Sequence, residues 1–254
     1  MIHTHIDWED IGITAVLGCY SPDGGEDAEY HIMIELNSNY AIAEEQYRLL
    51  EVAVQRLIKM PELKKATLIW KHFYVSDAIN QAPYLTASAG EAVSVVQQPP
   101  LNGSKASLWL YFVENVQIST EQDSTTIMMR PLYTHIINTR LHERSVVESN
   151  SPLIPLPSSI EHQTHRIFDR YTQNLSRYGC TLERNCIRTW VFVQDVDVQY
   201  TGMVVARRKF FEHEGLTNQT HFIASTGIEG RYIFPEVLVM MDAYAIAGDR
   251  KSVV

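Results

Sequence analysis

One arrangement occurs twice in this chain, and it limits the fold more than any other feature. Residues 42–60 and 160–178 both carry apolar side chains at helical spacing, and the two segments begin 118 residues apart. Each is followed by an aromatic-rich, β-prone segment that ends in Val-x-Asp, at 75–77 and 193–195, again 118 residues apart. This fixed spacing indicates an internal duplication. Coincidence is the alternative, because a helix followed by a strand is a common pairing.

The segments around these two landmarks predict the same order of elements, β-β-α-β-α-β-β, in both halves. Ser158 and Glu161 have the spacing of a capping box at the start of the second long helix. We therefore expect an α+β protein with two tandem domains, 1–118 and 119–254, each an antiparallel-rich sheet with helices on one face. In the first half the expected strands are 11–20, 28–36, 66–75, 92–98 and 106–116, and in the second half they are 126–139, 186–193, 221–225 and 236–246, with a further helix at 198–213.

Composition excludes several classes of protein. A length of 254 residues suits two domains, and the longest apolar runs fall far short of the ~20 residues that cross a bilayer. The amino terminus has no basic region followed by an apolar one, and the three cysteines form no C-x-x-C pair. A net charge of −9 argues against general affinity for nucleic acid. We expect a cytoplasmic protein with no membrane or nucleic-acid partner.

Residues 186–228 carry several motifs in a fixed order. An Arg-Thr-Trp strand contains Arg188, a helix follows with Tyr200 and the basic cluster 207–209, and then comes Ser-Thr-Gly-Ile at 225–228. In this order the motifs resemble the RidA/YjgF superfamily, and its chorismatase-like branch in particular. The resemblance covers 158–247 well and the first half more weakly, through 66–77 and 93–113. It implies a chorismate-mutase-like fold and assembly into homotrimers with ligand clefts between subunits.

The resemblance also implies which positions act on a substrate. In typical RidA proteins an arginine before a Ser-Thr pair holds the substrate carboxylate, and a glutamate on the last strand positions a water. These positions fall on Ala224 and Asp242 here, and on about Val93 and Leu110 in the first half. Neither alanine nor valine replaces the paired donors of a guanidinium, so standard imine or enamine deamination is not expected. The chorismatase-like branch uses an acid on the last strand, which makes Asp242 the catalytic candidate.

The residues themselves leave alternatives open at each candidate. Asp242 lies in an apolar strand, where a carboxylate is shifted toward its protonated form unless it faces solvent. Arg188 either anchors a carboxylate or lies on the outward side of its strand. Ser225, Thr226 and Gly227 would form a turn whose hydroxyls and amides suit an anion, or simply a turn.

The remaining candidates are treated in the same way. Tyr200 either donates a hydrogen bond to a ligand or lies at the edge of the core. Arg207 or Arg208, of which Arg208 is the candidate taken, either reaches the ligand or belongs to a solvated helix face with Lys209. His162 and His165 lie one helical turn apart, but no third ligand is spaced to join them. We therefore expect no metal and no cofactor.

Two functions follow, and the sequence leaves open whether the chain is an enzyme. The first is a hydrolase or lyase of the chorismatase or deaminase type, acting on a carboxylate-bearing, chorismate- or enamine-like metabolite. Asp242 would be its acid, and Arg188, Tyr200, Arg208 and residues 225–227 would bind substrate. The second is a non-catalytic protein that binds a ligand or partner on the same scaffold. Ribonuclease activity, a label common in this superfamily, has little support from an acidic chain.

Overall fold

A computed structural model describes residues 2–21, 27–37, 42–85, 92–121, 125–130, 134–142 and 159–248. The chain divides into two compact units, one formed by Met1–Gln122 with Thr126–Arg130 and the other by Asp123–Thr125 with Pro131–Val254. In the parts of the chain that the structure describes, every helix is too short or too polar to cross a membrane.

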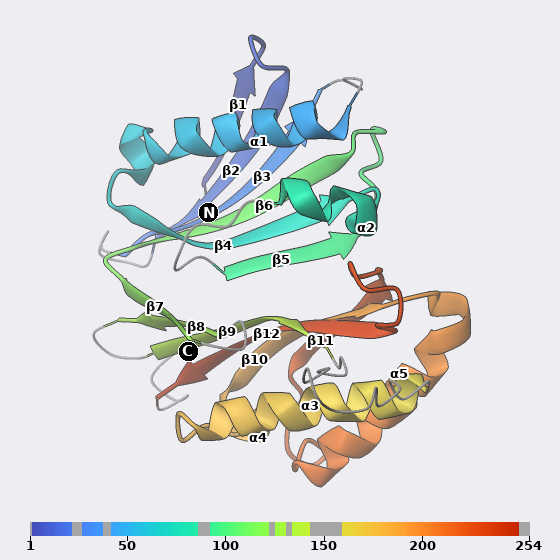
Figure 1. Ribbon diagram of the computed structural model, residues 1–254. Coiled ribbons are helices and arrows are strands. Elements are labelled where there is room, and N and C mark those ends of the chain that lie inside the picture. The colour runs from blue at the N-terminus through green and yellow to red at the C-terminus, as the bar shows by residue number, and fades with distance from the viewer. Residues whose placement is uncertain are drawn as a thin grey trace, which may run out of the picture. The chain divides into compact units, whose positions relative to one another are not determined.

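The first half contains one six-stranded sheet with a long helix on one face (Figure 1). The strands lie in the order β1-β2-β3-β6-β4-β5, and neighbouring strands are antiparallel except β4 and β5, which are parallel. Its elements are β1 (Ile2–Trp8), β2 (Ile13–Tyr20), β3 (Glu29–Leu36), α1 (Ala43–Ile58), η1 (Pro61–Leu63), β4 (Ala66–Val75), α2 (Ala78–Gln81), η2 (Ala82–Tyr84), β5 (Ala92–Gln97) and β6 (Ala106–Glu114).

The second half repeats this plan with a second six-stranded sheet, and α3 and α5 cover one of its faces (Figure 1). The strand order is β7-β8-β9-β12-β10-β11, which matches the first sheet strand for strand. Its elements are β7 (Gln117–Glu121), β8 (Thr125–Met129), β9 (Thr134–Leu141), α3 (Ile160–Ser176), α4 (Leu182–Asn185), β10 (Cys186–Val193), α5 (Val196–His213), β11 (Ala224–Glu229) and β12 (Val239–Ala247). The predicted α+β class is confirmed. Each half has three strands before its long helix, one more than the predicted order, and in the second half β8 and β9 occupy the expected single strand 126–139 while β7 precedes them.

Buried hydrogen bonds repeat between the halves as well. The side-chain oxygen of Gln46 on α1 accepts the N–H of Lys105 at 2.6 Å, and that of Gln163 on α3 accepts the N–H of Leu238 at 2.9 Å. Both glutamines are 1% exposed. The first bond fixes the residue just before β6, which lies between β3 and β4, and the second fixes the residue just before β12, which lies between β9 and β10. Two long helices thus use the same side chain for the same purpose, which supports the interpretation as a duplication.

The central strands share an irregularity. The pairing of β4 with β6 shifts between Leu68 and Trp70, and that of β10 with β12 shifts between Cys186 and Arg188. The two shifts lie at positions 118 residues apart, the spacing found in the sequence. A bulge bends its strand and resets which side chains point to each face. The two sheets therefore present equivalent positions on equivalent faces.

The halves differ most in the connection between their parallel strands. In the first half β4 is joined to β5 through the four-residue helix α2 and the short η2, whereas β10 is joined to β11 through the 18-residue helix α5. A side chain from the end of each edge strand supports the helix that follows the central strand. Gln97 accepts the N–H of Ala78 at 3.0 Å, and Glu229 accepts the N–H of Val196 at 2.6 Å.

The start of α3 corrects one expectation. The N-cap is Ser159, whose Oγ accepts the N–H of His162 at 3.2 Å, while Ser158 lies outside the described residues. Glu161 still takes part, because it accepts a hydrogen bond from Ser159 Oγ at 2.9 Å. The capping side chain is thus one residue later than the S-x-x-E pattern indicated.

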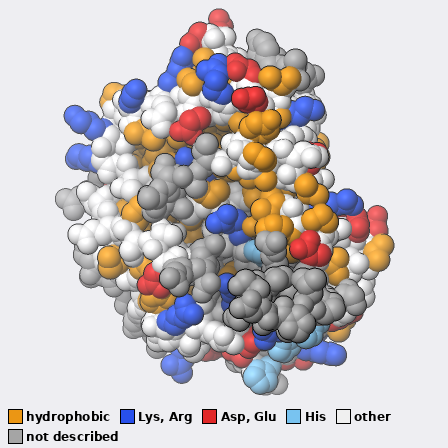
Figure 2. Space-filling model, viewed as in Figure 1, with side chains coloured by type: hydrophobic (Ala, Val, Ile, Leu, Met, Phe, Trp, Pro, Cys, Tyr) orange, Lys and Arg blue, Asp and Glu red, His pale blue; other side chains and the backbone are white. Residues whose placement is uncertain are grey.

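The surface seen in Figure 2 mixes charges of both signs. Among the described residues on this face, Lys and Arg side chains alternate with Asp and Glu, and no continuous basic area forms.

Candidate functional site

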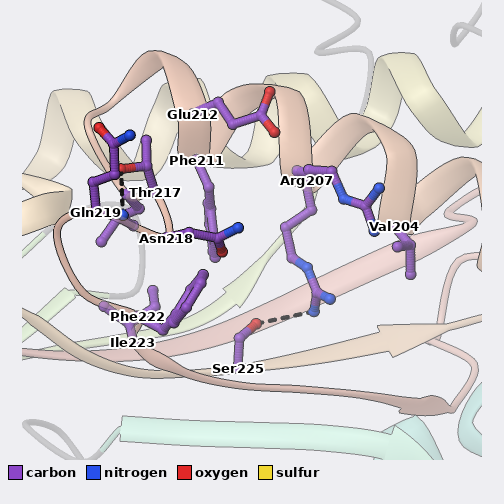
Figure 3. Close-up of a pocket in the computed structure, with 12 residues that line it drawn as sticks. Val204, Arg207, Phe211, Glu212, Thr217, Asn218, Gln219, Phe222, Ile223 and Ser225 are labelled. Atoms are coloured by element: carbon purple, nitrogen blue, oxygen red, sulfur yellow. Dashed lines mark hydrogen bonds between the residues drawn. The ribbon is translucent and has the colours of Figure 1, made fainter.

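The second half contains a pocket of about 820 Å³ between α5, the segment that follows it and the edge strand β11 (Figure 3). Residues 214–223 connect the end of α5 to the start of β11 and contribute about half of the lining. Its lining falls within one short stretch of the chain: Val204, Arg207, Arg208, Phe211, Glu212, Leu216, Thr217, Asn218, Gln219, Phe222, Ile223 and Ser225. Two of the predicted ligand-binding residues, Arg208 and Ser225, are among them.

A linked set of side chains forms the polar end of this pocket. Arg207 Nη1 on α5 donates a hydrogen bond of 3.0 Å to Ser225 Oγ on β11, as the dashed line in Figure 3 shows. Thr189 Oγ1 on β10 donates to the same oxygen at 2.8 Å. Desolvation by burial lowers the pKa of the Arg207 guanidinium below its ordinary value, but an arginine stays charged at neutral pH. A half-buried cation therefore borders the pocket.

The opposite end of the pocket is apolar. In Figure 3, Phe211 points from α5 toward Phe222, and Asn218 lies beside Phe211. Phe222 is 67% exposed, which is unusual for so large an apolar side chain. Glu212 is the acidic residue of the lining. The pocket thus has a cationic, hydrogen-bonding end and an aromatic end.

The strand β11 divides the predicted site between two faces of the sheet. Ser225 contacts α5 through Arg207, and a Cβ on Gly227 would lie 2.9 Å from Met203 and 3.1 Å from the Tyr200 ring. Both positions therefore face α5, and we call this side the helix face. Successive side chains of a strand alternate, so Thr226 points to the opposite side, which we call the far face. The sequence treated 225–227 as a turn, and the structure corrects this to a strand.

Arg188 lies on the far face with Thr226. Its Nη2 donates to Thr226 Oγ1 at 3.1 Å, and its guanidinium carbon lies 4.9 Å from the centre of the Trp190 ring. Such stacking holds a guanidinium in place while leaving part of its hydrogen-bonding edge accessible. Arg188 is half-buried and pairs in register with Ala224 on β11.

Asp242 also belongs to the far face, because it pairs with Trp190 and directly opposed residues point to the same side. Its side chain is 0% exposed, and its Oδ1 accepts the N–H of Arg140 at 2.8 Å. Arg140 has a φ of 54°, at the point where two residues of β9 face one residue of β12. A visible role of this carboxylate is thus to hold the backbone amide of a β-bulge.

The seven predicted site residues therefore fall into two groups. Tyr200, Arg208, Ser225 and Gly227 lie on the helix face, and Arg188, Thr226 and Asp242 lie on the far face. Sequence reasoning selected Arg208 from the basic cluster, but the exposed Arg208 lies at the rim, whereas Arg207 bonds to Ser225. Arg207 follows the buried Met203 by four residues, so helical spacing carried a signal for it. Nothing in the sequence marked Phe222.

Equivalent positions in the first half carry different chemistry. Trp70 takes the place of Arg188, and it pairs with Ala92 on the edge strand. Trp109 takes the place of Asp242. The sequence placed the counterparts of Ala224 and Asp242 at about Val93 and Leu110, and the observed register puts them one residue earlier, at Ala92 and Trp109. Within the described residues of either half, no group of three His, Cys, Asp or Glu side chains is arranged to hold a metal.

Comparison with known proteins identifies the fold. No family model matches this sequence, and no curated protein does. Among solved structures, a chorismatase aligns with a TM-score of 0.58 at 12% identity, over 92% of this chain and 77% of its own. A YjgF-family protein from Neisseria meningitidis covers 53% of this chain and 97% of its own (TM-score 0.40, 12% identity). The E. coli YjgF gene product covers 44% and 80%, respectively (TM-score 0.35, 19% identity).

The likeness to chorismatase confirms the fold that the sequence motifs implied, at the level of architecture. The chorismatase alignment spans both halves, in keeping with the tandem arrangement and with the shared strand order of the two sheets. At 12% identity it concerns the backbone and not the site. The chain therefore has the tandem α+β fold of chorismatase.

Proposed function

We propose that this chain binds a small carboxylate-bearing molecule in the pocket between α5, residues 214–223 and β11. The observation that supports the proposal is the Arg207–Ser225 pair at the end of an 820 Å³ pocket. Cavities of about 300–1,000 Å³ are typical of small-molecule sites. A half-buried guanidinium attracts a carboxylate more strongly than an exposed one, because less water competes for it.

Arg207 has the donors that such a ligand needs. A guanidinium carries five N–H groups, and the bond to Ser225 uses one of them. Arg208 adds a second positive charge at the rim, where it would raise the local concentration of anions. The pocket lies within one half of a single chain, so the proposal does not depend on assembly.

Calorimetric titration with simple carboxylates tests the proposal. Arg207→Gln should weaken carboxylate binding by at least about tenfold, since a hydrogen bond to a charged group contributes about 1.5–3 kcal/mol. Arg48→Gln is the matched control, because Arg48 pairs with Glu45 on the exposed side of α1, is not part of the pocket lining, and its replacement makes the same change in charge. If no carboxylate binds, or if both variants behave alike, the proposal fails.

A second candidate function is acid chemistry at Asp242 on a carboxylate-bearing, chorismate- or enamine-like metabolite. What favours it is that Arg188, Thr226 and Asp242 share the far face, with Arg188 tied to Thr226. Arg188 would hold the carboxylate and Asp242 would supply a proton. A cleft between subunits of a homotrimer would complete such a site, as the motif resemblance implies.

Two measurements bear on this candidate. Turnover of chorismate or of an enamine that disappears in Asp242→Asn would support it, provided that the fold is unchanged. The fold should be kept, because the side-chain oxygen of the substituted amide can still accept the N–H of Arg140. Turnover that survives in this variant would exclude Asp242 as the acid. Sedimentation analysis tests the trimer, and a monomer would exclude the inter-subunit cleft while leaving the pocket beside α5 intact.

A further inference from the structure

The hydrogen bonds of Ser225 limit what its hydroxyl can offer to a ligand. A serine oxygen has two lone pairs that accept and one O–H that donates. Arg207 Nη1 donates to this oxygen at 3.0 Å, and Thr189 Oγ1 donates to it at 2.8 Å. Both acceptor positions are therefore occupied from within the protein. The hydroxyl proton is what Ser225 has left for a ligand.

The other polar group at this end has the same property. A guanidinium carries donors and no acceptor, and it remains protonated in proteins. Arg207 and Ser225 together therefore present donors alone to the pocket. A ligand group that binds Arg207 and Ser225 must accept hydrogen bonds and carry no N–H or O–H that needs an acceptor. A carboxylate meets both conditions. An ammonium would meet a cation, and an alcohol would find no acceptor for its proton at these two residues.

The apolar end adds a preference about shape. Phe211 and Phe222 both lie at the side of the pocket away from Arg207 (Figure 3), and Leu216 and Ile223 also line the pocket. Aromatic side chains favour offset-stacked or edge-to-face contacts with another ring. The exposed Phe222 has much of its surface accessible for such a contact. A flat ring gains both this geometry and the burial of its apolar surface.

We propose that the ligand is a planar aromatic monocarboxylate, whose carboxylate accepts from Arg207 and Ser225 while its ring packs against Phe211 and Phe222. This inference deepens the proposed function and rests on it. It adds two requirements that general carboxylate binding does not have. The polar group of the ligand must accept hydrogen bonds and donate none, and the rest of the ligand must be an aromatic ring.

The experiment compares four small probes on the intact chain by calorimetry. Benzoate has both features, hexanoate has the carboxylate without the ring, and benzylamine and benzyl alcohol have the ring without the carboxylate. We expect benzoate to bind at least about tenfold more tightly than benzylamine or benzyl alcohol and several-fold more tightly than hexanoate.

Two variants separate the two requirements. Phe222→Leu keeps an apolar side chain at an exposed position, so the fold is retained, and it should weaken benzoate about threefold while leaving hexanoate unchanged. Ser225→Ala removes the donor and should weaken both carboxylates about tenfold. The Ser225→Ala variant also leaves the Thr189 hydroxyl without its acceptor, which could lower stability. The melting temperature of Ser225→Ala is therefore compared with that of Thr189→Val, a variant that removes the same internal hydrogen bond by removing its donor.

The outcomes distinguish the inference from the function on which it rests. If hexanoate binds as tightly as benzoate and Phe222→Leu affects neither, the aromatic requirement is wrong while carboxylate binding stands. If benzylamine binds as well as benzoate, the donor-only polar end is wrong. If none of the probes binds, both the inference and the proposed function are excluded.

Discussion

The carboxylate of Asp242 on β12 accepts the backbone N–H of Arg140 on β9 at 2.8 Å, at the position where the register between these strands shifts. Arg140 has a φ of 54°, a left-handed conformation that non-glycine residues adopt at a cost. The buried carboxylate helps to hold it there. The strand position that resemblance marks as catalytic thus has a clear part in stabilising the sheet.

Replacing this carboxylate should therefore affect stability. Asp242→Ala removes the acceptor of a buried amide and should lower the free energy of unfolding by about 1–3 kcal/mol. Asp242→Asn keeps an acceptor oxygen and should cost less than half as much. Urea denaturation of the two variants measures the difference. Equal stability of Asp242→Ala and the wild type would show that the bulge does not need this side chain.

Gly202 on α5 allows close packing against α3. A Cβ at this position would lie 2.5 Å from Ile160 Cγ2 and 2.6 Å from Glu161 Oε1. Within a helix, alanine is favoured over glycine by about 1 kcal/mol, but an overlap with a branched side chain costs about 1–3 kcal/mol. We expect Gly202→Ala to lower the melting temperature, because the overlap outweighs the propensity. A rise in melting temperature would mean that α3 and α5 are less tightly packed than the structure indicates.

His72 on β4 should make the stability of the protein depend on pH. Burial lowers its pKa to about 3 from the ordinary 6.5, so the folded chain keeps this ring neutral while the unfolded chain protonates it. Its contribution is complete above about pH 6.5 and is lost as the pH falls toward 3, by at most about 1.4 kcal/mol per pH unit. Between pH 6.5 and 5, the free energy of unfolding should fall less steeply for His72→Phe than for the wild type. His162→Gln, at an exposed position, is the control for the loss of a histidine ring.

Gln46 and Gln163 offer a matched test of the repeated architecture. Each is buried in the first long helix of its half and accepts a backbone amide. Gln46→Leu and Gln163→Leu should each destabilise the protein by about 1–3 kcal/mol, since both leave that amide without its acceptor. Denaturant titration of the two variants should give losses of the same order. A loss confined to one variant would show that the two halves no longer depend on the same bond.

Elements with strong local patterns could be predicted closely from the sequence. The strands at 66–75 and 186–193 have the bounds that the aromatic and β-branched runs indicated, because these runs are buried and end in turn-forming residues. The first strand, Ile2–Trp8, was missed. Its side chains are mostly exposed, although Ile2, Ile6 and Trp8 alternate with polar residues, and β2 supplies a complete hydrogen-bonding edge for it.

The candidate site was harder to predict for a physical reason. Ser225 and Thr226 are neighbours in the sequence, but a strand places them on opposite faces, and only the register against β10 decides which faces α5. The choice between Arg207 and Arg208 likewise depends on a rotation of about 100° along a helix. Phe222 lies in a connection without periodicity. Composition and motif order indicated the region of the candidate site, but which side chains face the pocket depends on tertiary packing.

All twelve residues around the pocket lie between Val204 and Ser225. Ligand recognition by this protein would therefore depend on one continuous segment, residues 204–225, which the rest of the sheet holds in place. Replacing this segment with the equivalent segment of another protein of the same architecture should transfer the ligand preference without changes to the other strands.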